Sequence, residues 1–133
     1  MKYLLDTHTL LWVLFEDEKL SEKAKDVIRN PENEIYVSLI TYWEIALKYG
    51  IGKLELENIT PEEIPHKAKE INIDTLEISE SEVSTYFKLP KIKHKDPFDR
   101  LIIWQAINKN ITLISKDKDI EEYKAFGLKL LWD

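Results

Sequence analysis

Short apolar runs alternate with segments of helical periodicity along the whole chain. Apolar runs typical of strands occupy residues 2–5, 34–37, 75–78, 111–115 and 128–131. Helical patterns occupy residues 9–15, 22–29, 39–49, 61–72, 80–89 and 97–110, and a further short helix is expected from about residue 120. Strands that alternate with helices are typical of a mostly parallel sheet covered on both faces. The pattern therefore predicts a three-layer α/β fold.

Polar residues that commonly begin helices stand in front of several helical segments. The segments TPEE and SESE match the capping box, in which a hydroxyl residue and a Glu three positions later each pair with a backbone N–H group. The segment 39–49 is apolar on nearly all sides, so this helix is predicted to be buried, and Gly50 and Gly52 are expected to end it. N-caps are predicted at Ser21, Ser38, Thr60, Ser79 and Asp96.

Length and composition narrow the class of protein. The 133 residues, 44% of them hydrophobic, predict one compact domain spanning residues 1–133. The chain has no cysteine, which excludes a disulfide framework, a thiolate zinc site and a cysteine nucleophile. Asp6 and His8 interrupt the N-terminal apolar run, so we expect neither a signal peptide nor a membrane span, and we expect a cytoplasmic protein.

The net charge of −6 has the wrong sign for holding nucleic acid by bulk electrostatics. Any role in nucleic-acid binding must therefore be local. The acidic residues either form a solvated surface or converge on a cation that in turn meets a phosphate, and composition does not choose between these alternatives.

Two acidic residues stand where a parallel sheet places its reactive crevice, beyond the carboxyl ends of strands. Asp6 ends the run KYLL, and Asp117 follows ITLIS by one residue. Each could instead cap a helix, and for Asp6 the two roles are evenly balanced. Asp119 with Glu122 makes the better capping box after the later strand, which leaves Asp117 available as a ligand.

Two further acidic residues lie within apolar helix faces. Glu44 is in line with Ile40 and Leu47, and Asp99 is in line with Ile102 and Ile103. Burying an unpaired carboxylate is costly, so each needs a partner. For Glu44 the structural alternative is an ion pair with Lys48 at i+4. For Asp99 it is a favourable position in the first turn of its helix.

The four carboxylates together suggest a metal centre. Crowded carboxylates raise one another's pKa unless a divalent cation lies among them. Oxygen ligands in a chain without cysteine favour Mg²⁺ or Mn²⁺ over zinc. Such a cation can polarise a phosphoryl oxygen and supply hydroxide for hydrolysis of a phosphodiester.

Four segments of the chain carry a resemblance to a known family. LLDTHTLLW, SLITYWEIALKYGIGKL, HKDPFDRLIIWQA and LISKD look like the four acidic motifs of PIN-domain proteins, in the order of that family, and they span almost the whole chain. The likeness is strongest to VapC-type toxins of toxin–antitoxin pairs. It implies a Mg²⁺- or Mn²⁺-dependent endoribonuclease acting on single-stranded RNA, a homodimer and a cognate antitoxin. The metal ligands that it implies are Asp6, Glu44, Asp99 and Asp117, with Ser115 as a supporting hydroxyl.

Some residues around these motifs have open roles. His8 stands where many family members have Asn, and a core or solvent-facing His is favoured over a catalytic base. Asp96 is an extra acidic residue that could join the metal through water, and Thr7 adjoins the first ligand. The basic loop 91–95 could grip phosphate or simply be solvated. The side chains that would act in the first case are Lys93, Lys95 and Arg100.

Two other classes of protein compete with the nuclease. One is a non-catalytic PIN-fold module that binds RNA or protein, which the presence of all four acidic residues disfavours. The other is a Mg²⁺-dependent phosphoryl-transfer protein of the receiver or haloacid-dehalogenase type. Receivers have an N-terminal acidic pair, and these phosphatases have Asp two residues after the nucleophile. Here Thr7 and His8 follow Asp6, so both patterns fit poorly.

Overall fold

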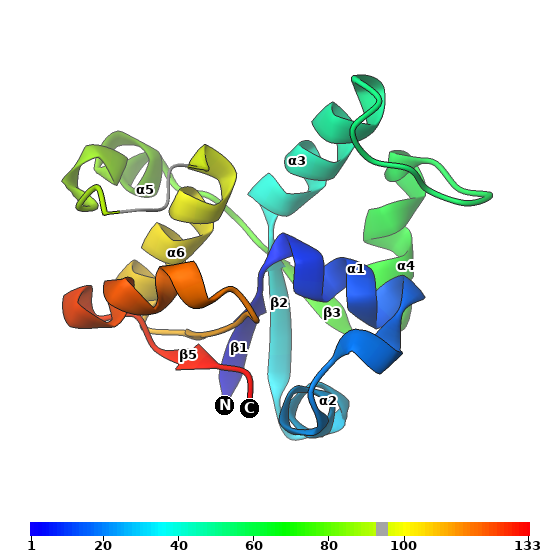
Figure 1. The fold of residues 1–133 in the computed structure, drawn as a ribbon, viewed down its shortest axis with the longest axis horizontal. Coiled ribbons are helices and arrows are strands. Elements are labelled where there is room, and N and C mark those ends of the chain that lie inside the picture. Colours follow the sequence, from blue (N-terminus) through cyan, green and yellow to red (C-terminus); the bar gives the residue numbers. More distant parts are fainter. Residues whose placement is uncertain (93–95) are drawn as a thin grey trace.

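Five parallel strands form the centre of the molecule (Figure 1). The computed structural model describes residues 1–92 and 96–133. Within them the strand order is β3-β2-β1-β4-β5, and all four neighbouring pairs are parallel. This arrangement confirms the predicted α/β class. The strands are β1 (Lys2–Leu5), β2 (Glu34–Ser38), β3 (Ile73–Leu76), β4 (Thr112–Ile114) and β5 (Leu130–Leu131).

Helices connect the strands. The α-helices are α1 (Thr7–Phe15), α2 (Glu22–Arg29), α3 (Leu39–Gly50), α4 (Ile64–Glu70), α5 (Glu80–Ser84) and α6 (Pro97–Lys109). Four 3-10 helices supplement them: η1 (Asp17–Lys19), η2 (Pro61–Glu63), η3 (Tyr86–Lys88) and η4 (Lys118–Phe126). Every predicted helical segment is therefore present, although several have different bounds or a different helical type. No helix in the described part of the chain is both long and apolar enough to cross a membrane.

Most predicted helix starts are confirmed by hydrogen bonds. The side chains of Ser21 and Ser38 accept from the backbone N–H groups of Ala24 and Ile40. Ser79 and Glu82 make both bonds of the capping box. The segment 61–72 is divided into η2 and α4, because Pro65 has no N–H to donate to the preceding turn.

The third strand lies two residues earlier than predicted. β3 pairs with β2 from Ile73 to Leu76, whereas the apolar run suggested residues 75–78. The carbonyl of Glu77 instead accepts from Gln105 Nε2 at 3.1 Å. The backbone therefore leaves the strand ladder at this residue and turns toward α6.

Apolar side chains fill both faces of the sheet. The cluster on one face contains Leu10 of α1, Ala24 of α2, and Ile64 and Ala68 of α4. The cluster on the other contains Ile102 and Ile103 of α6 with Ile120 and Tyr123 of η4. Figure 1 shows α5 and α6 on one side of the sheet and α1 and α4 on the other. These two covered faces confirm the three-layer arrangement.

Helix α3 is less buried than predicted. Ile40, Thr41, Glu44 and Ile45 are buried, but the side chain of Trp43 is 59% exposed and Leu39 is also exposed. The prediction of a buried helix was therefore wrong for part of α3: Ile45 lies in one core cluster and Ile40 in the other, while Leu39 and Trp43 are exposed.

Candidate active site

Asp6 lies at the carboxyl end of β1, beside the end of β4. The register places Leu5 beside Ile114, so Asp6 comes next to Ser115. One carboxylate oxygen, Oδ1, accepts from the backbone N–H of Thr9 at 2.8 Å and caps α1. The other, Oδ2, accepts from Ser115 Oγ at 2.5 Å. Burial raises the pKa of Asp6, and these hydrogen bonds only partly oppose that effect. Asp6 is therefore both a helix cap and a desolvated carboxylate.

Asp117 follows β4 and is the N-cap of η4. Its backbone N–H donates to Ser115 Oγ at 3.1 Å, and its Oδ1 accepts from the N–H of Asp119 at 2.9 Å. The sequence had favoured Asp119 as the cap, and this expectation was wrong because the 3-10 helix begins at Lys118, directly after Asp117. Ser115 thus bridges Asp6 and Asp117 through its hydroxyl group.

Glu44 is the most buried of the four predicted ligands, with 2% of its surface exposed. Its Oε1 accepts from Thr7 Oγ1 at 2.7 Å, and Thr7 in turn contacts Thr41 Oγ1 at 3.0 Å. Its Oε2 accepts from Lys48 Nζ at 2.5 Å. The ion pair considered from the sequence is therefore present. Thr7 directly follows Asp6, so its hydrogen bond links Glu44 to the start of α1.

Asp96 and Asp99 approach Glu44 from the start of α6. Asp96 Oδ1 accepts from the N–H groups of Phe98 and Asp99 at 2.9 and 3.4 Å, which confirms the predicted N-cap. One ligand oxygen from each of Glu44, Asp96 and Asp99 lies within 4.8 Å of the others. Three carboxylates at this spacing match the oxygen donors that Mg²⁺ and Mn²⁺ prefer. Sequence reasoning had left open whether Asp96 joins the metal through water.

Asp99 also faces a second group of acidic residues. It lines a cleft of about 360 Å³ together with Asp6 and Asp117. The four predicted ligands and Asp96 thus fall into two groups that share Asp99: a carboxylate trio of Glu44, Asp96 and Asp99, and a strand-end group of Asp6, Asp99 and Asp117. Asp99 is the residue common to both groups, and we refer to the five carboxylates together as the acidic site.

Lys48 supplies positive charge to the carboxylate trio. Burial lowers its pKa, but the hydrogen bond to Glu44 and the charges of Glu44, Asp96 and Asp99 more than compensate, so the pKa of Lys48 is raised. The i+4 spacing had pointed to the contact with Glu44, but nothing local in the sequence indicated the other two carboxylates.

Three side chains were predicted to contact phosphate: Lys93, Lys95 and Arg100. Arg100 is 6% exposed, and its guanidinium donates to Tyr86 Oη at 2.9 Å and to the carbonyl of Leu89 at 2.8 Å. It therefore joins α6 to the preceding segment and does not face the acidic site as an exposed cation. Lys93 and Lys95 lie outside the described residues. His8 is solvent-exposed, as favoured from the sequence.

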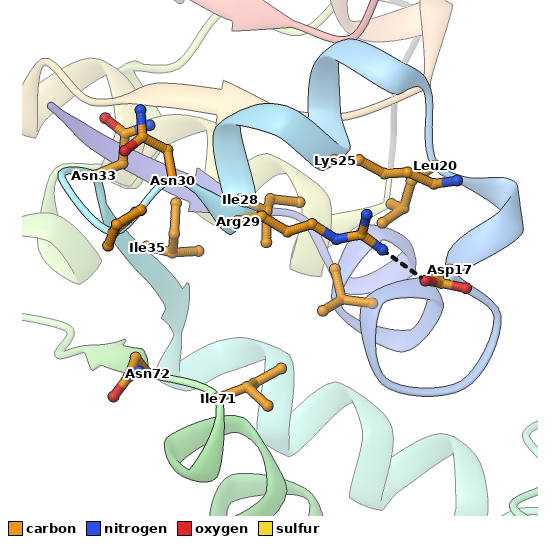
Figure 2. A pocket seen from close by; sticks show the side chains of 12 residues that line it. Asp17, Leu20, Lys25, Ile28, Arg29, Asn30, Asn33, Ile35, Ile71 and Asn72 are labelled. Atoms are coloured by element: carbon orange, nitrogen blue, oxygen red, sulfur yellow. Dashed lines mark hydrogen bonds and ion pairs between the residues drawn. The ribbon is translucent and has the colours of Figure 1, made fainter.

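A separate pocket lies away from these acidic residues (Figure 2). Its lining includes Asn33 at the start of β2 and Asn72 just before β3, so it opens at the amino ends of the strands. Two of its charged residues, Asp17 and Arg29, pair with each other at 3.0 Å. Ligands of open parallel sheets bind at the opposite, carboxyl edge, which is where the acidic site lies.

The acidic site and the parallel sheet agree with a comparison against known families. A family model described as the PIN domain matches residues 3–125. The chain belongs to the PIN-domain family. This PIN domain is similar to ribonuclease VapC22 of Mycobacterium tuberculosis, with 28% identity over 121 residues and 91% of each chain covered.

Solved structures share the fold of this PIN domain. It superposes on VapBC2 from Rickettsia felis, bound to a DNA fragment from its promoter, with a TM-score of 0.69, 21% identity and 100% of each chain covered. For VapBC-1 from nontypeable Haemophilus influenzae the TM-score is 0.61 at 20% identity, covering 98% of this chain and 97% of the other. These TM-scores show a common fold.

Proposed function

We propose that this PIN domain is a metal-dependent endoribonuclease that hydrolyses single-stranded RNA as the toxin of a toxin–antitoxin pair. The observation that carries the proposal is the acidic site in which Asp99 joins Glu44 and Asp96 to Asp6 and Asp117. The similarity to a ribonuclease, VapC22, supports the choice of RNA.

The proposed metal ligands are Asp6, Glu44, Asp99 and Asp117, and the proposed ion is Mg²⁺ or Mn²⁺. A bound ion would polarise a phosphoryl oxygen and lower the pKa of water. The protein holds the ligands in position: the Ser115 hydroxyl fixes Asp6 and the backbone of Asp117, and Thr7 fixes Glu44. Asp96 has one oxygen committed to the helix cap, so we assign it a supporting role.

The direct test is cleavage of a labelled single-stranded RNA by purified protein. We expect cleavage with Mg²⁺ or Mn²⁺ and none in excess EDTA. The matched control is Asp119→Asn, which removes an exposed carboxylate two residues after Asp117. Full cleavage in EDTA would contradict the proposal. RNA binding without cleavage under any divalent ion would instead favour the non-catalytic module.

The proposed partner is an antitoxin that places Arg or Lys among the carboxylates. The structural neighbours include a toxin–antitoxin complex from Klebsiella pneumoniae, and a guanidinium suits a pair of carboxylates. Lys48 already places one cation beside Glu44, Asp96 and Asp99. If the protein encoded beside this gene inhibits cleavage, replacing its basic residues with Gln should abolish inhibition. Equal inhibition by the altered partner would contradict this mechanism.

The proposed oligomer is a homodimer. An apolar groove lies between α3, α5 and α6, lined by residues including Trp43, Val83 and Phe98, and Trp43 and Val83 are more than half exposed. Such patches commonly mark protein interfaces. We expect light scattering to give twice the mass of the chain for the wild type and the mass of one chain for Trp43→Glu. An unchanged dimer in this variant would exclude the groove as the interface.

A further inference from the structure

Trp12 stands in the acidic cleft, on the first helix after Asp6. The cleft that contains Asp6, Asp99 and Asp117 is also lined by His8, Trp12 and Lys116. The neighbours of Trp12 on α1, Leu11 and Val13, pack against the core cluster of one sheet face. Trp12 is half-buried like these two neighbours, but it lines the acidic cleft and they do not. Its position therefore differs from that of the apolar residues around it.

Other rings and cations surround the indole of Trp12. The His8 ring lies 6.0 Å from it at a tilt of 41°, and the Trp132 ring lies 5.8 Å from it at 59°. Lys116 Nζ lies 5.9 Å from the ring centroid, within the range of a cation–π contact. The hydroxyl of Ser21 donates to the carbonyl of Trp132, which anchors the C-terminal ring. We call Trp12, His8 and Lys116 the aromatic shelf.

The aromatic shelf combines aromatic rings with a cation, and these are the groups that bind single-stranded nucleic acid. Proteins bind single strands by combining aromatic faces, on which bases stack, with cations that meet the backbone. This chain carries a net charge of −6, so favourable contacts with RNA must be concentrated at particular places. His8 and Lys116 are exposed and lie in the same cleft as the carboxylates proposed to hold the metal.

We propose that the aromatic shelf is a nucleobase-binding subsite, in which Trp12 stacks on a base adjoining the phosphate that is cleaved. His8 extends the ring surface, and Lys116 meets the phosphate backbone. The inference rests on the proposed function and adds a specific contact with the substrate. The subsite would position the strand so that one phosphodiester lies at Asp6, Asp99 and Asp117.

The test combines protein variants with RNA that lacks single bases. The probe is a short fluorescent single-stranded RNA of mixed sequence, and a matched set carries one abasic position next to the cleaved bond. Binding is measured by anisotropy in Ca²⁺, under conditions in which a gel shows no cleavage. The variants are Trp12→Leu, which keeps apolar bulk without a stacking face, and Trp12→Phe, which keeps a ring. The control is Phe15→Ala, an exposed aromatic on the same helix that lines a different cleft.

We expect Trp12→Leu to weaken binding by about five-fold to a hundred-fold, the range for loss of one stacked base. Trp12→Phe should recover most of the affinity, and Phe15→Ala should match the wild type. Removing the base should weaken binding to the wild type but have no further effect on Trp12→Leu. Melting curves identify any variant that is unfolded. If Trp12→Leu is unfolded, the test is the binding of Trp12→Phe and the wild type to the abasic RNAs.

Two results would overturn the inference. One is wild-type affinity in Trp12→Leu; the other is an equal abasic penalty in Trp12→Leu and the wild type. In either case, wild-type cleavage of the intact RNA would leave the proposed function standing. A wild-type protein that neither binds nor cleaves RNA with any divalent ion would overturn the proposed function and the subsite together.

Discussion

At the scale of single residues, Asp99 has a position that no other carboxylate in the described chain shares. It lies in the carboxylate trio with Glu44 and Asp96, and it lines the cleft with Asp6 and Asp117. Asp96 lies three residues earlier and has one oxygen engaged by the backbone of α6. The two acidic residues are therefore unequal in what they can offer a metal ion.

Replacing these two residues with Asn should separate their roles. Asp99→Asn removes a charge from both groups, so we expect metal affinity to fall at least about ten-fold and cleavage to be lost. Asp96→Asn keeps the helix cap, since Asn caps about as well as Asp, and should retain substantial cleavage. The measurement is cleavage rate against Mg²⁺ concentration. An inactive Asp96→Asn beside an active Asp99→Asn would reverse our assignment.

Asp6 should make the metal-free protein sensitive to pH. Burial raises its pKa in the folded state, so the folded protein holds this proton more tightly than the unfolded chain does. The stability due to this group is therefore present below the unfolded pKa and lost as pH rises through the folded pKa. In EDTA, Asp6→Asn should melt at a higher temperature than the wild type near neutral pH. The difference should disappear on acidification, in melting curves recorded between about pH 8 and about pH 4. A constant difference at every pH would count against a raised pKa.

Lys48 should compete with a metal ion for the carboxylate trio. Its ammonium lies 2.5 Å from Glu44 Oε2, and Asp96 and Asp99 also stabilise its charge. Lys48→Met should lower the stability of the metal-free protein by about 1–3 kcal/mol, because Glu44 loses its partner. It should also raise the affinity for Mn²⁺ measured by calorimetry. Lys48→Arg is the control that keeps the charge, and unchanged affinity in Lys48→Met would exclude competition.

At the scale of elements, Arg100 joins three segments around the start of α6. Its guanidinium contacts Tyr86 of η3, the carbonyl of Leu89 and the hydroxyl of Tyr123 in η4. The Tyr86 ring also lies 5.0 Å from its guanidinium carbon. Because α6 carries Asp99 and Asp117 caps η4, these contacts hold together two of the elements that position the acidic site.

Loss of the Arg100 contacts should therefore affect stability. We expect Arg100→Met to lower the free energy of unfolding by about 2–3 kcal/mol, as charged hydrogen bonds to buried acceptors are lost. Arg29→Met removes an exposed ion pair with Asp17 and should change it by less than about 1 kcal/mol. Denaturant titration gives both values. If Arg100→Met keeps full stability but loses RNA binding, the phosphate-gripping role considered from the sequence is restored.

At the scale of the whole molecule, the proposed metal ligands come from helices on both faces of the sheet. Asp6 precedes α1, which packs in one core cluster, Asp99 lies on α6 in the other, and Glu44 lies on α3, which contributes Ile45 to the first cluster and Ile40 to the second. An ion bound among these carboxylates would cross-link the two halves of the fold. It would also relieve repulsion among charges that the folded state brings together.

Metal binding should consequently stabilise the folded protein. An ion that binds only the folded state at a hundred times its dissociation constant contributes about 2.7 kcal/mol. For a domain of this size we expect a rise in melting temperature of about 5–10 °C. Differential scanning fluorimetry across a Mn²⁺ titration measures it, with Asp99→Asn as the variant that should show little rise. A melting temperature independent of Mn²⁺ would mean that no such site is formed.

The sequence by itself determined the features that depend on neighbouring residues. Capping side chains and apolar periodicity act within a few positions, so the order of strands and helices and most helix starts could be predicted. The parallel sheet followed from that order and placed Asp6 and Asp117 at its carboxyl edge. The expectation that β3 begins at Thr75 was wrong, because pairing with β2 fixes where that strand lies.

Only the tertiary structure decided which side chains meet. The register of β1 and β4 brings Ser115 to Asp6, and the packing of α3 beside α6 brings Lys48 and Asp96 to the acidic residues. Packing also buries Arg100, which the sequence had placed beside a basic loop, among Tyr86, Leu89 and Tyr123. Each of these contacts depends on the relative placement of elements far apart along the chain. Local sequence patterns carry no direct information about that placement.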